Sequence, residues 1–158
     1  MIRIGNGYDV HKFGAGIDFW LGGIKINSDK GSIAHSDGDV LIHAICDALL
    51  GAAALKDIGY HFPDNDNQYK NIDSKILLKK VVELLTNKGY SIANIDSVVC
   101  LQQPKIKPYI DEMQLCLAKV MNIDIDRISI KATTTEKLGF IGREEGIAAY
   151  AVVLVEKQ

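Results

Sequence analysis

Three side chains in the first third of the chain have the types and spacing of a metal site. Asp9 and His11 are two residues apart in a segment that predicts a strand, so their side chains share a face about 6.6 Å apart. His43 lies near the start of the next predicted helix and completes a set of two imidazoles and one carboxylate. Such a set suits zinc, and three protein ligands leave a fourth position open, as in catalytic sites. The alternative is that both histidines only hydrogen-bond to loop backbone, because an Asp-x-His pair is common by chance.

Two further polar features lie close to that set. Asp47, one helical turn beyond His43, either orients the imidazole or is a solvated helix carboxylate, and the second interpretation is favoured. The run HSDGD that starts at His35 directly precedes an apolar helix, so Ser36 or Asp37 can cap that helix. A cap does not account for His35, and the free N–H groups of a helix N-terminus also favour a phosphate.

Later segments carry hydroxyls, a carboxylate and cations that suit a phosphorylated ligand. The stretch Thr133–Glu136 (TTTE) follows a predicted strand, and its hydroxyls can donate to phosphoryl oxygens while Glu136 can hold Mg²⁺. Threonines also favour strands, and without the adjacent carboxylate that interpretation would be preferred. Leu101–Lys107 (LQQPKIK) is a basic turn whose backbone could contact a base. Arg143 lies in a glycine-flanked turn, where it either binds an anion or is solvated.

Length and composition predict one globular domain over residues 1–158. A chain of 158 residues can bury close to ~70% of its unfolded surface, enough for a core without disulfides. Hydrophobic residues make up 47% and charged residues 24%, which disfavours disorder and coiled coils. The formal charge is −2 and no block of Lys and Arg occurs, so we expect no nucleic-acid partner.

Cysteine spacing and the lengths of apolar runs predict the cellular compartment of the protein. Cys46, Cys100 and Cys116 lie far apart, which favours buried thiols in a reducing environment over a disulfide framework. The longest apolar stretch, Gly146–Val155, is about half as long as a membrane span requires. We therefore expect a cytoplasmic protein without a membrane partner.

Hydrophobic periodicity predicts strands and helices that do not alternate strictly. The strands are predicted at Ile2–Lys12, Phe19–Ile26 (with a turn or bulge at Gly22–Gly23), Ser97–Gln103, Ile128–Thr134 and Ile147–Glu156. The helices are predicted at Val40–Leu55, from an Asp73 cap to Asn87, and after Pro108, while Asp57–Asn67 predicts an irregular loop. The apolar run Ile147–Val155 predicts a strand buried on both faces. The fold class is therefore α+β, a single domain with a mixed β-sheet covered by helices on one face.

Long motifs across the chain resemble the 2-C-methyl-D-erythritol 2,4-cyclodiphosphate synthase family. They are RIGNGYDVHKF, LGGIKI, AHSDGDVLIHAICDALLGAAALKDIGYHFPD, QQPKIKPYI and IKATTTEKLGFIGREEGIAAYAVVLV, in family order. The resemblance implies a homotrimer with active sites between neighbouring subunits. It also implies a small-molecule cytidine diphosphate substrate, 4-diphosphocytidyl-2-C-methyl-D-erythritol 2-phosphate. The 2-phosphate of that substrate attacks the β-phosphorus, CMP leaves and the cyclic diphosphate forms, in the non-mevalonate route to isoprenoid precursors.

The resemblance also implies a role for each matching residue. Asp9, His11 and His43 match zinc ligands, and Glu136 matches the ligand of magnesium (or manganese) bound with the substrate phosphates. His35 and Thr134 match positions that stabilise the transition state. The positions that match substrate-binding segments are Asp9, His11, His35, Ser36, Asp57, Ile58, Gly59, Phe62, Pro63, Asp64, Asn65, Asp66, Leu101, Gln102, Gln103, Pro104, Lys105, Ile106, Lys107, Thr133, Thr134, Thr135, Glu136, Phe140 and Arg143.

Charge and family pattern leave two competing functions. The predicted site holds several carboxylates, which would repel an anionic substrate unless cations intervene. The chain departs from the family pattern at Asn6, Asn65 and Glu144, where histidine, threonine and glycine are usual, but none is a predicted metal ligand. One alternative is a metal-dependent nucleotide phosphodiesterase that uses water. The other is a non-catalytic trimeric binding protein, which the loss of a metal ligand would have favoured.

Overall fold

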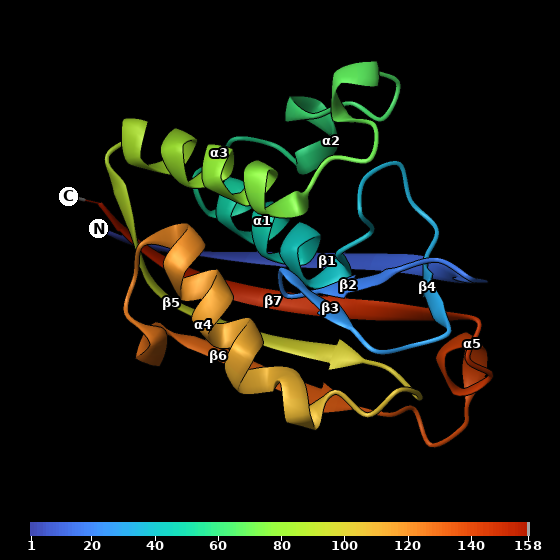
Figure 1. Cartoon of the computed structure of the whole chain (residues 1–158). Helices are drawn as coiled ribbons and strands as arrows, with labels where there is room; N and C mark the ends of the chain where they lie inside the picture. Colours follow the sequence, from blue (N-terminus) through green and yellow to red (C-terminus); the bar gives the residue numbers. More distant parts are fainter. Residues whose placement is uncertain (158) are drawn as a thin grey trace.

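A five-stranded sheet forms one layer of the structure, a computed structural model that describes residues 1–157 (Figure 1). The strand order is β4-β1-β7-β5-β6. Three neighbouring pairs are antiparallel and β5 pairs with β6 in parallel, so the sheet is mixed. The strands are β1 (Ile2–Ala15), β4 (Lys30–Ser32), β5 (Tyr90–Cys100), β6 (Ile128–Thr133) and β7 (Gly146–Lys157), and a separate hairpin consists of β2 (Phe19–Leu21) and β3 (Ile24–Ile26).

The three long helices all cover the same face of the sheet, as Figure 1 shows. They are α1 (Val40–Ala52), α3 (Ser74–Asn87) and α4 (Ile110–Met121), and the short helices are α2 (Ile58–His61) and α5 (Gly139–Gly142). Single 3₁₀ turns occur at Asn67–Tyr69, Lys107–Tyr109 and Ile125–Arg127. The predicted α+β class with helices on one face is confirmed. Among residues 1–157, no helix is long and apolar enough to cross a membrane.

Two glycines of β1 let α1 lie directly on the sheet. A Cβ atom at Gly5 would lie 1.9 Å from the Ala48 carbonyl oxygen, and one at Gly7 would lie 2.0 Å from that of Ala44. Only residues without a side chain permit such an approach of two backbones. Because β1 carries Asp9 two residues after Gly7, this contact brings α1 and its side chains over the carboxylate.

The N-terminus of α1 is capped by Asp39, so the predicted cap at Ser36 or Asp37 is wrong. The Asp39 carboxylate is fully buried and accepts hydrogen bonds from the N–H groups of Ile42, Gly22 and Gly23 at 3.0, 3.0 and 2.7 Å. Burial, and the charge of Asp37, raise the pKa of Asp39, although these backbone hydrogen bonds act in the opposite direction. Asp39 directly precedes the first helical residue, which is the position from which a carboxylate reaches the free N–H groups. One side chain thus ties α1 to the β2–β3 hairpin.

Several predicted boundaries are corrected by the structure. The helix predicted at Val40–Leu55 ends at Ala52. The strand predicted at Ser97–Gln103 begins earlier, at Tyr90, and ends at Cys100, because polar residues and a bulge between Ile92 and Asn94 interrupt the apolar pattern at its start. The loop predicted at Asp57–Asn67 contains α2, whose cap is Asp57. The sequence did not predict β4 or α5, both of which are too short for a periodic signal. The predicted cap of α3 at Asp73 is confirmed.

The prediction that Ile147–Val155 is buried on both faces is wrong for the single chain. Tyr150 and Val152 of β7 are 46% and 44% exposed. They lie on the sheet face without long helices, beside the equally exposed Tyr8 of β1. We call this surface the open face; its exposed apolar residues are Ile2, Ile4, Tyr8, Val10, Tyr150 and Val152.

We expect Gly7→Ala to destabilise the fold, because the new methyl group would meet backbone that must move rather than a flexible side chain. The free energy of unfolding should fall by about 1–3 kcal/mol in urea denaturation. Gly51→Ala is the matched control, since its Cβ would come no closer than 4.0 Å to any atom of the neighbouring strand. It should leave stability unchanged or raise it by about 0.5–1 kcal/mol. Equal stabilities for the two variants would contradict the close approach of α1 to β1.

Candidate active site

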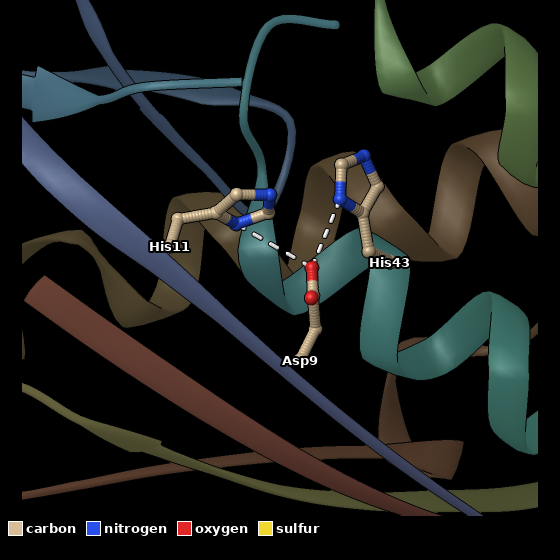
Figure 2. Close-up of side chains that lie close together, drawn as sticks. All are labelled: Asp9, His11 and His43. Carbon is tan, nitrogen blue, oxygen red and sulfur yellow. Dashed lines mark hydrogen bonds and ion pairs between the residues drawn. The ribbon is translucent and has the colours of Figure 1, made fainter. Parts of the chain in front are cut away.

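Asp9, His11 and His43 converge on one point between β1 and α1. Figure 2 shows both imidazole rings directed at the same carboxylate oxygen. The Nδ1 atoms of His43 and His11 lie 3.0 and 3.4 Å from Oδ2 of Asp9. One ligand atom from each residue lies within 4.8 Å of the others, so this group could hold a metal ion. The predicted proximity of these three side chains is confirmed.

The donor set of this cluster fits a divalent cation. Nδ1 of His11 is buried and has no hydrogen-bond partner among the described residues. Nδ1 of His43 and Nδ1 of His11 both face Oδ2 of Asp9, which can only accept when ionised. Two imidazole nitrogens and a carboxylate oxygen are ligands that zinc accepts. A cation at this point would satisfy all three atoms together.

Burial and charge act differently on the two imidazoles. Burial lowers the pKa of His11, and the charge of Asp9 offsets this only in part. Burial would also lower the pKa of His43, but the hydrogen bond and charge of Asp9, together with the charges of two further aspartates, raise it above its usual value. His43 therefore lies in a region of negative charge that favours its protonated form, and the same charge would favour a metal cation at this point.

A pocket of about 200 Å³ opens beside the cluster. It lies between β1, α1, α2 and the loop before α1. Its lining includes nine of the residues predicted for zinc or substrate. Those nine are Asp9, His11, His35, Ser36, His43, Ile58, Gly59, Phe62 and Asp64, and the other lining residues are Ala34, Asp47, Tyr69, Ile72 and Leu77.

Four predicted residues near this pocket do not line it. Asp57 is exposed and uses its carboxylate to cap α2, accepting from the Tyr60 N–H at 2.8 Å. Asp66 contributes its backbone oxygen, which accepts from Nε2 of His35 at 3.3 Å. The other two, Pro63 and Asn65, are exposed in the same loop.

Asp47 lines the pocket but neither touches His43 nor stands free in solvent. Its Oδ1 accepts a hydrogen bond from the Ile58 N–H at 2.7 Å, which fastens the start of α2 to α1. Burial raises the pKa of Asp47. Both interpretations offered by the sequence are therefore replaced by a third, in which this carboxylate anchors the pocket wall.

The later predicted segments form a second group at the end of β5 and β6. The Leu101 N–H donates to the Thr133 carbonyl at 2.9 Å, and the Lys137 N–H donates to Oε1 of Gln102 at 3.3 Å. These segments meet because β5 and β6 are parallel, so their C-terminal ends lie at the same edge. Glu136 is exposed in the following loop, beside Thr134, whose Oγ1 accepts the Glu136 N–H at 3.2 Å.

The last two predicted residues lie near α5. Phe140 lines a shallow hollow together with Val10 and His11, at the margin of the metal cluster. Arg143 is exposed and forms a two-point ion pair with Glu145, at 3.0 and 3.3 Å. The neighbouring Glu144 pairs with Lys30 rather than with Arg143.

One chain does not bring the two groups into a single site. In the strand register, Val10 is opposite Ala148, Ala148 is opposite Cys100, and Cys100 is opposite Thr133. Three strand spacings separate the first and last of these residues, about 14 Å. Residues opposite each other point to the same face, so Thr133 points to the open face with Val10, whereas Asp9 and His11 point toward the helices.

Comparison with known proteins identifies the family. The model of the YgbB family matches residues 2–156. The chain belongs to the YgbB family. The 2-C-methyl-D-erythritol 2,4-cyclodiphosphate synthase of Bacteroides fragilis is 64% identical over 156 residues, which are 99% of this chain and 98% of the relative. The family resemblance predicted from the sequence motifs is thus confirmed.

Solved structures agree with this YgbB-family assignment. An IspF–CDP complex from Plasmodium falciparum superimposes with a TM-score of 0.88 at 39% identity, over 99% of this chain and 97% of that chain. The bifunctional IspDF of Campylobacter jejuni gives a TM-score of 0.97 at 46% identity and covers all of this chain, which spans 43% of that protein. The likeness to the Plasmodium falciparum protein extends over nearly the whole of both chains.

The sequence did not reveal one residue that contacts the cluster of Asp9, His11 and His43. Ser74, the first residue of α3, is fully buried and lies 2.9 Å from Nε2 of His43. A serine directly after the capping residue Asp73 is ordinary at the start of a helix. Only the packing of α3 beside α1 brings its hydroxyl to the imidazole, so no local signal could have identified it.

We expect purified protein to bind about one divalent ion per chain, and His43→Ala to retain less than about a tenth of that amount. The reason is that the variant loses one of only three ligands. Metal content after gel filtration measures this, with circular dichroism to verify folding. His61→Ala is the matched control, because that imidazole donates to the Leu55 carbonyl outside the cluster. Wild-type metal content in a folded His43→Ala protein would disprove the assignment.

Proposed function

We propose that this chain converts 4-diphosphocytidyl-2-C-methyl-D-erythritol 2-phosphate to 2-C-methyl-D-erythritol 2,4-cyclodiphosphate with release of CMP. The observation that carries this proposal is the identity of 64% over 98% of a relative that bears the synthase name. The convergence of Asp9, His11 and His43 beside a pocket supplies the matching chemistry. The reaction belongs to the supply of isoprenoid precursors.

The N-terminal cluster would hold zinc through Oδ2 of Asp9 and one nitrogen from each histidine. A divalent ion there supplies electrostatic stabilisation for charge that develops on phosphoryl oxygens. The chain's own part is to fix the three residues that would hold the ion on two packed elements, β1 and α1, in the lining of the pocket. Rigid supports of this kind hold ligands within the tolerance that catalysis needs.

No side chain has to act as the nucleophile in this reaction. The attacking phosphate belongs to the substrate and is already ionised, so catalysis consists of aligning two phosphates and neutralising charge. His35 and Ser36 line the pocket beside the cluster. The Ser36 hydroxyl can donate a hydrogen bond to a phosphoryl oxygen, and His35 can do so in its protonated form, in which both ring nitrogens are donors. Asp64 lines the same pocket and suits a different task, accepting hydrogen bonds from sugar-like hydroxyls.

The later group would bind the cytidine and a second cation. Leu101–Lys107 offers backbone groups and two lysines, and Thr133, Thr134 and Glu136 follow the adjacent strand. Glu136 is exposed and forms no ion pair with any of residues 1–157, so its carboxylate is available to Mg²⁺ or Mn²⁺ bound with the substrate phosphates. The CDP in the Plasmodium falciparum complex supports a cytidine nucleotide as the ligand.

A homotrimer with sites shared between neighbours is the arrangement that suits this geometry. In one chain the metal cluster and Thr133 point to opposite faces of the sheet, about 14 Å apart across the strands. A neighbouring subunit can present its later group to the first subunit's pocket without any change of fold. The open face, with its exposed tyrosines and aliphatic side chains, supports the assembly because contact with other copies would bury it.

Product analysis distinguishes the proposed cyclisation from hydrolysis. Incubation of the cytidyl substrate with protein, zinc and magnesium should give a cyclic diphosphate and CMP in equal amounts. The appearance of both products is measured by ³¹P NMR. His43→Ala should give neither product. Linear phosphates instead of the cyclic compound would show that water is the nucleophile, and the function would then be that of a phosphodiesterase. Binding without any turnover would favour a non-catalytic protein.

Mixed oligomers test the shared site. His11→Ala damages the metal half and Thr133→Trp blocks the cytidine half, so each variant should be inactive alone. In a cyclic trimer with random equal mixing, about one site in four receives two intact halves, so activity should recover to about a quarter of wild type.

Tagged pull-down must first verify that the two variants exchange subunits, and each must be trimeric alone. If verified mixed trimers remain inactive, the halves of each site do not come from two subunits. Crosslinking that detects monomers alone would reject the trimer itself.

A further inference from the structure

Ser74 connects His43 to a second carboxylate, that of Asp37. Its hydroxyl donates to Oδ1 of Asp37, and its backbone N–H donates to Oδ2 of the same carboxylate at 2.9 Å. Both carboxylate oxygens of Asp37 therefore accept hydrogen bonds from the first residue of α3. On the other side, Oγ of Ser74 lies 2.9 Å from Nε2 of His43. The result is a continuous chain of hydrogen bonds that runs from Asp37 through Ser74 to the ligand imidazole.

The protons available in this series of hydrogen bonds determine which ring nitrogen of His43 is protonated. A serine hydroxyl has one proton, and here it is committed to the Asp37 carboxylate, which can only accept when ionised. Oγ of Ser74 must then accept the hydrogen bond that it shares with His43, so Nε2 of His43 carries a proton. When the ring is neutral, its lone pair is left on Nδ1. That atom faces Oδ2 of Asp9, at the point where the metal ligands converge.

A second hydroxyl near Nε2 does not have the same effect. Oγ of Ser36 lies 3.2 Å from Nε2 and accepts a hydrogen bond from the Gly38 N–H, but within the described part of the chain it forms no hydrogen bond to a carboxylate. Its own proton is free to rotate toward the imidazole, the pocket or solvent. Ser36 therefore places no constraint on which ring nitrogen is protonated, whereas Ser74 does.

We propose that Ser74 and Asp37 act together as positioning residues that hold His43 in the form protonated at Nε2, with Nδ1 presented to the metal. This inference rests on the proposed metal site, and it adds to that site a support from a third element, α3. A ligand imidazole that donates its other N–H to a fixed acceptor is oriented and made more basic. The zinc affinity of the cluster therefore depends on a residue that does not touch the metal.

Zinc affinity of the full-length protein, measured by competition with a chromophoric chelator and without substrate, tests the proposal. Ser74→Ala should weaken zinc binding about 10–100-fold, because the buried N–H of His43 loses its acceptor. Ser74→Thr keeps the hydroxyl and should remain within about threefold of wild type. Asp37→Asn should weaken binding about tenfold, since the amide lacks the charge that orients the serine, and it serves as the test if Ser74→Ala does not fold.

Two control variants distinguish positioning from a general loosening of the helix ends. Asp73→Ala removes the cap of α3, where the carboxylate accepts the Lys75 N–H at 2.9 Å, without touching His43. It should lower the melting temperature of the zinc-free protein and leave zinc affinity unchanged. Ser36→Ala removes the other hydroxyl near Nε2 and should also leave zinc affinity within about threefold. If Asp73→Ala weakens zinc binding as much as Ser74→Ala does, the role of Ser74 is only structural and the proposal is overturned.

A spectroscopic readout addresses the proton itself. In ¹H–¹⁵N spectra of the zinc-loaded protein, the Nε2–H of His43 should give a signal protected from solvent exchange in wild type and Ser74→Thr. The signal should be lost or shifted in Ser74→Ala. An unchanged signal together with unchanged zinc affinity in that variant would overturn the inference while leaving the metal site intact. Failure of wild type to bind zinc would instead overturn the proposed site, and the inference with it.

Discussion

The contact between α1 and β1 determines whether an active site exists at all. Two of the ligand side chains extend from a strand and the third from a helix, so their convergence depends on how closely these backbones approach. Gly5 and Gly7 permit an approach that any Cβ atom would block. Asp39 then fixes the start of the helix by accepting three backbone hydrogen bonds in a fully buried position. The cluster is therefore held in place by neighbouring residues that do not themselves belong to it, as precise sites require.

Electrostatics explains why the helix-covered side of the sheet is suited to a metal ion. Asp37, Asp39 and Asp47 all lie within or beside the layer between α1 and its neighbours, and burial raises the pKa of the last two. Among the groups near these carboxylates, His43 gains proton affinity from them, which raises its pKa. Such a concentration of acidic groups favours a divalent cation and disfavours a polyphosphate on its own. The anionic substrate of the proposed reaction can approach only because cations compensate this charge.

Local patterns were sufficient to predict that Asp9, His11 and His43 come together, but not which residues support them. The i, i+2 spacing of Asp9 and His11 determines a shared face in any strand, and His43 falls inside a clear helical period. The helix cap was assigned wrongly because three capping residues occur within four positions, and the choice depends on the turn geometry around Gly38. Ser74 could not be found, since its role depends on how α1 and α3, which are not consecutive in the chain, pack together. The apolar run of β7 was predicted to be buried on both faces, and hydrophobicity cannot tell whether the same chain or another copy covers it.

The two halves of the proposed site also differ in how firmly one chain holds them. The half proposed to bind the metal rests on β1, α1 and α3, and His43 at its centre is only 9% exposed. The other half ends in a loop where Glu136 and Lys137 both adopt positive φ angles, of 52° and 64°, and where both side chains are exposed. Non-glycine residues keep such backbone angles only where neighbouring contacts support them. A subunit contact at this loop would supply additional support, so assembly would both complete the site and stabilise the conformation that presents Glu136. The same contact can thus account for the exposed open face, the distance between the halves and the unusual backbone of this loop.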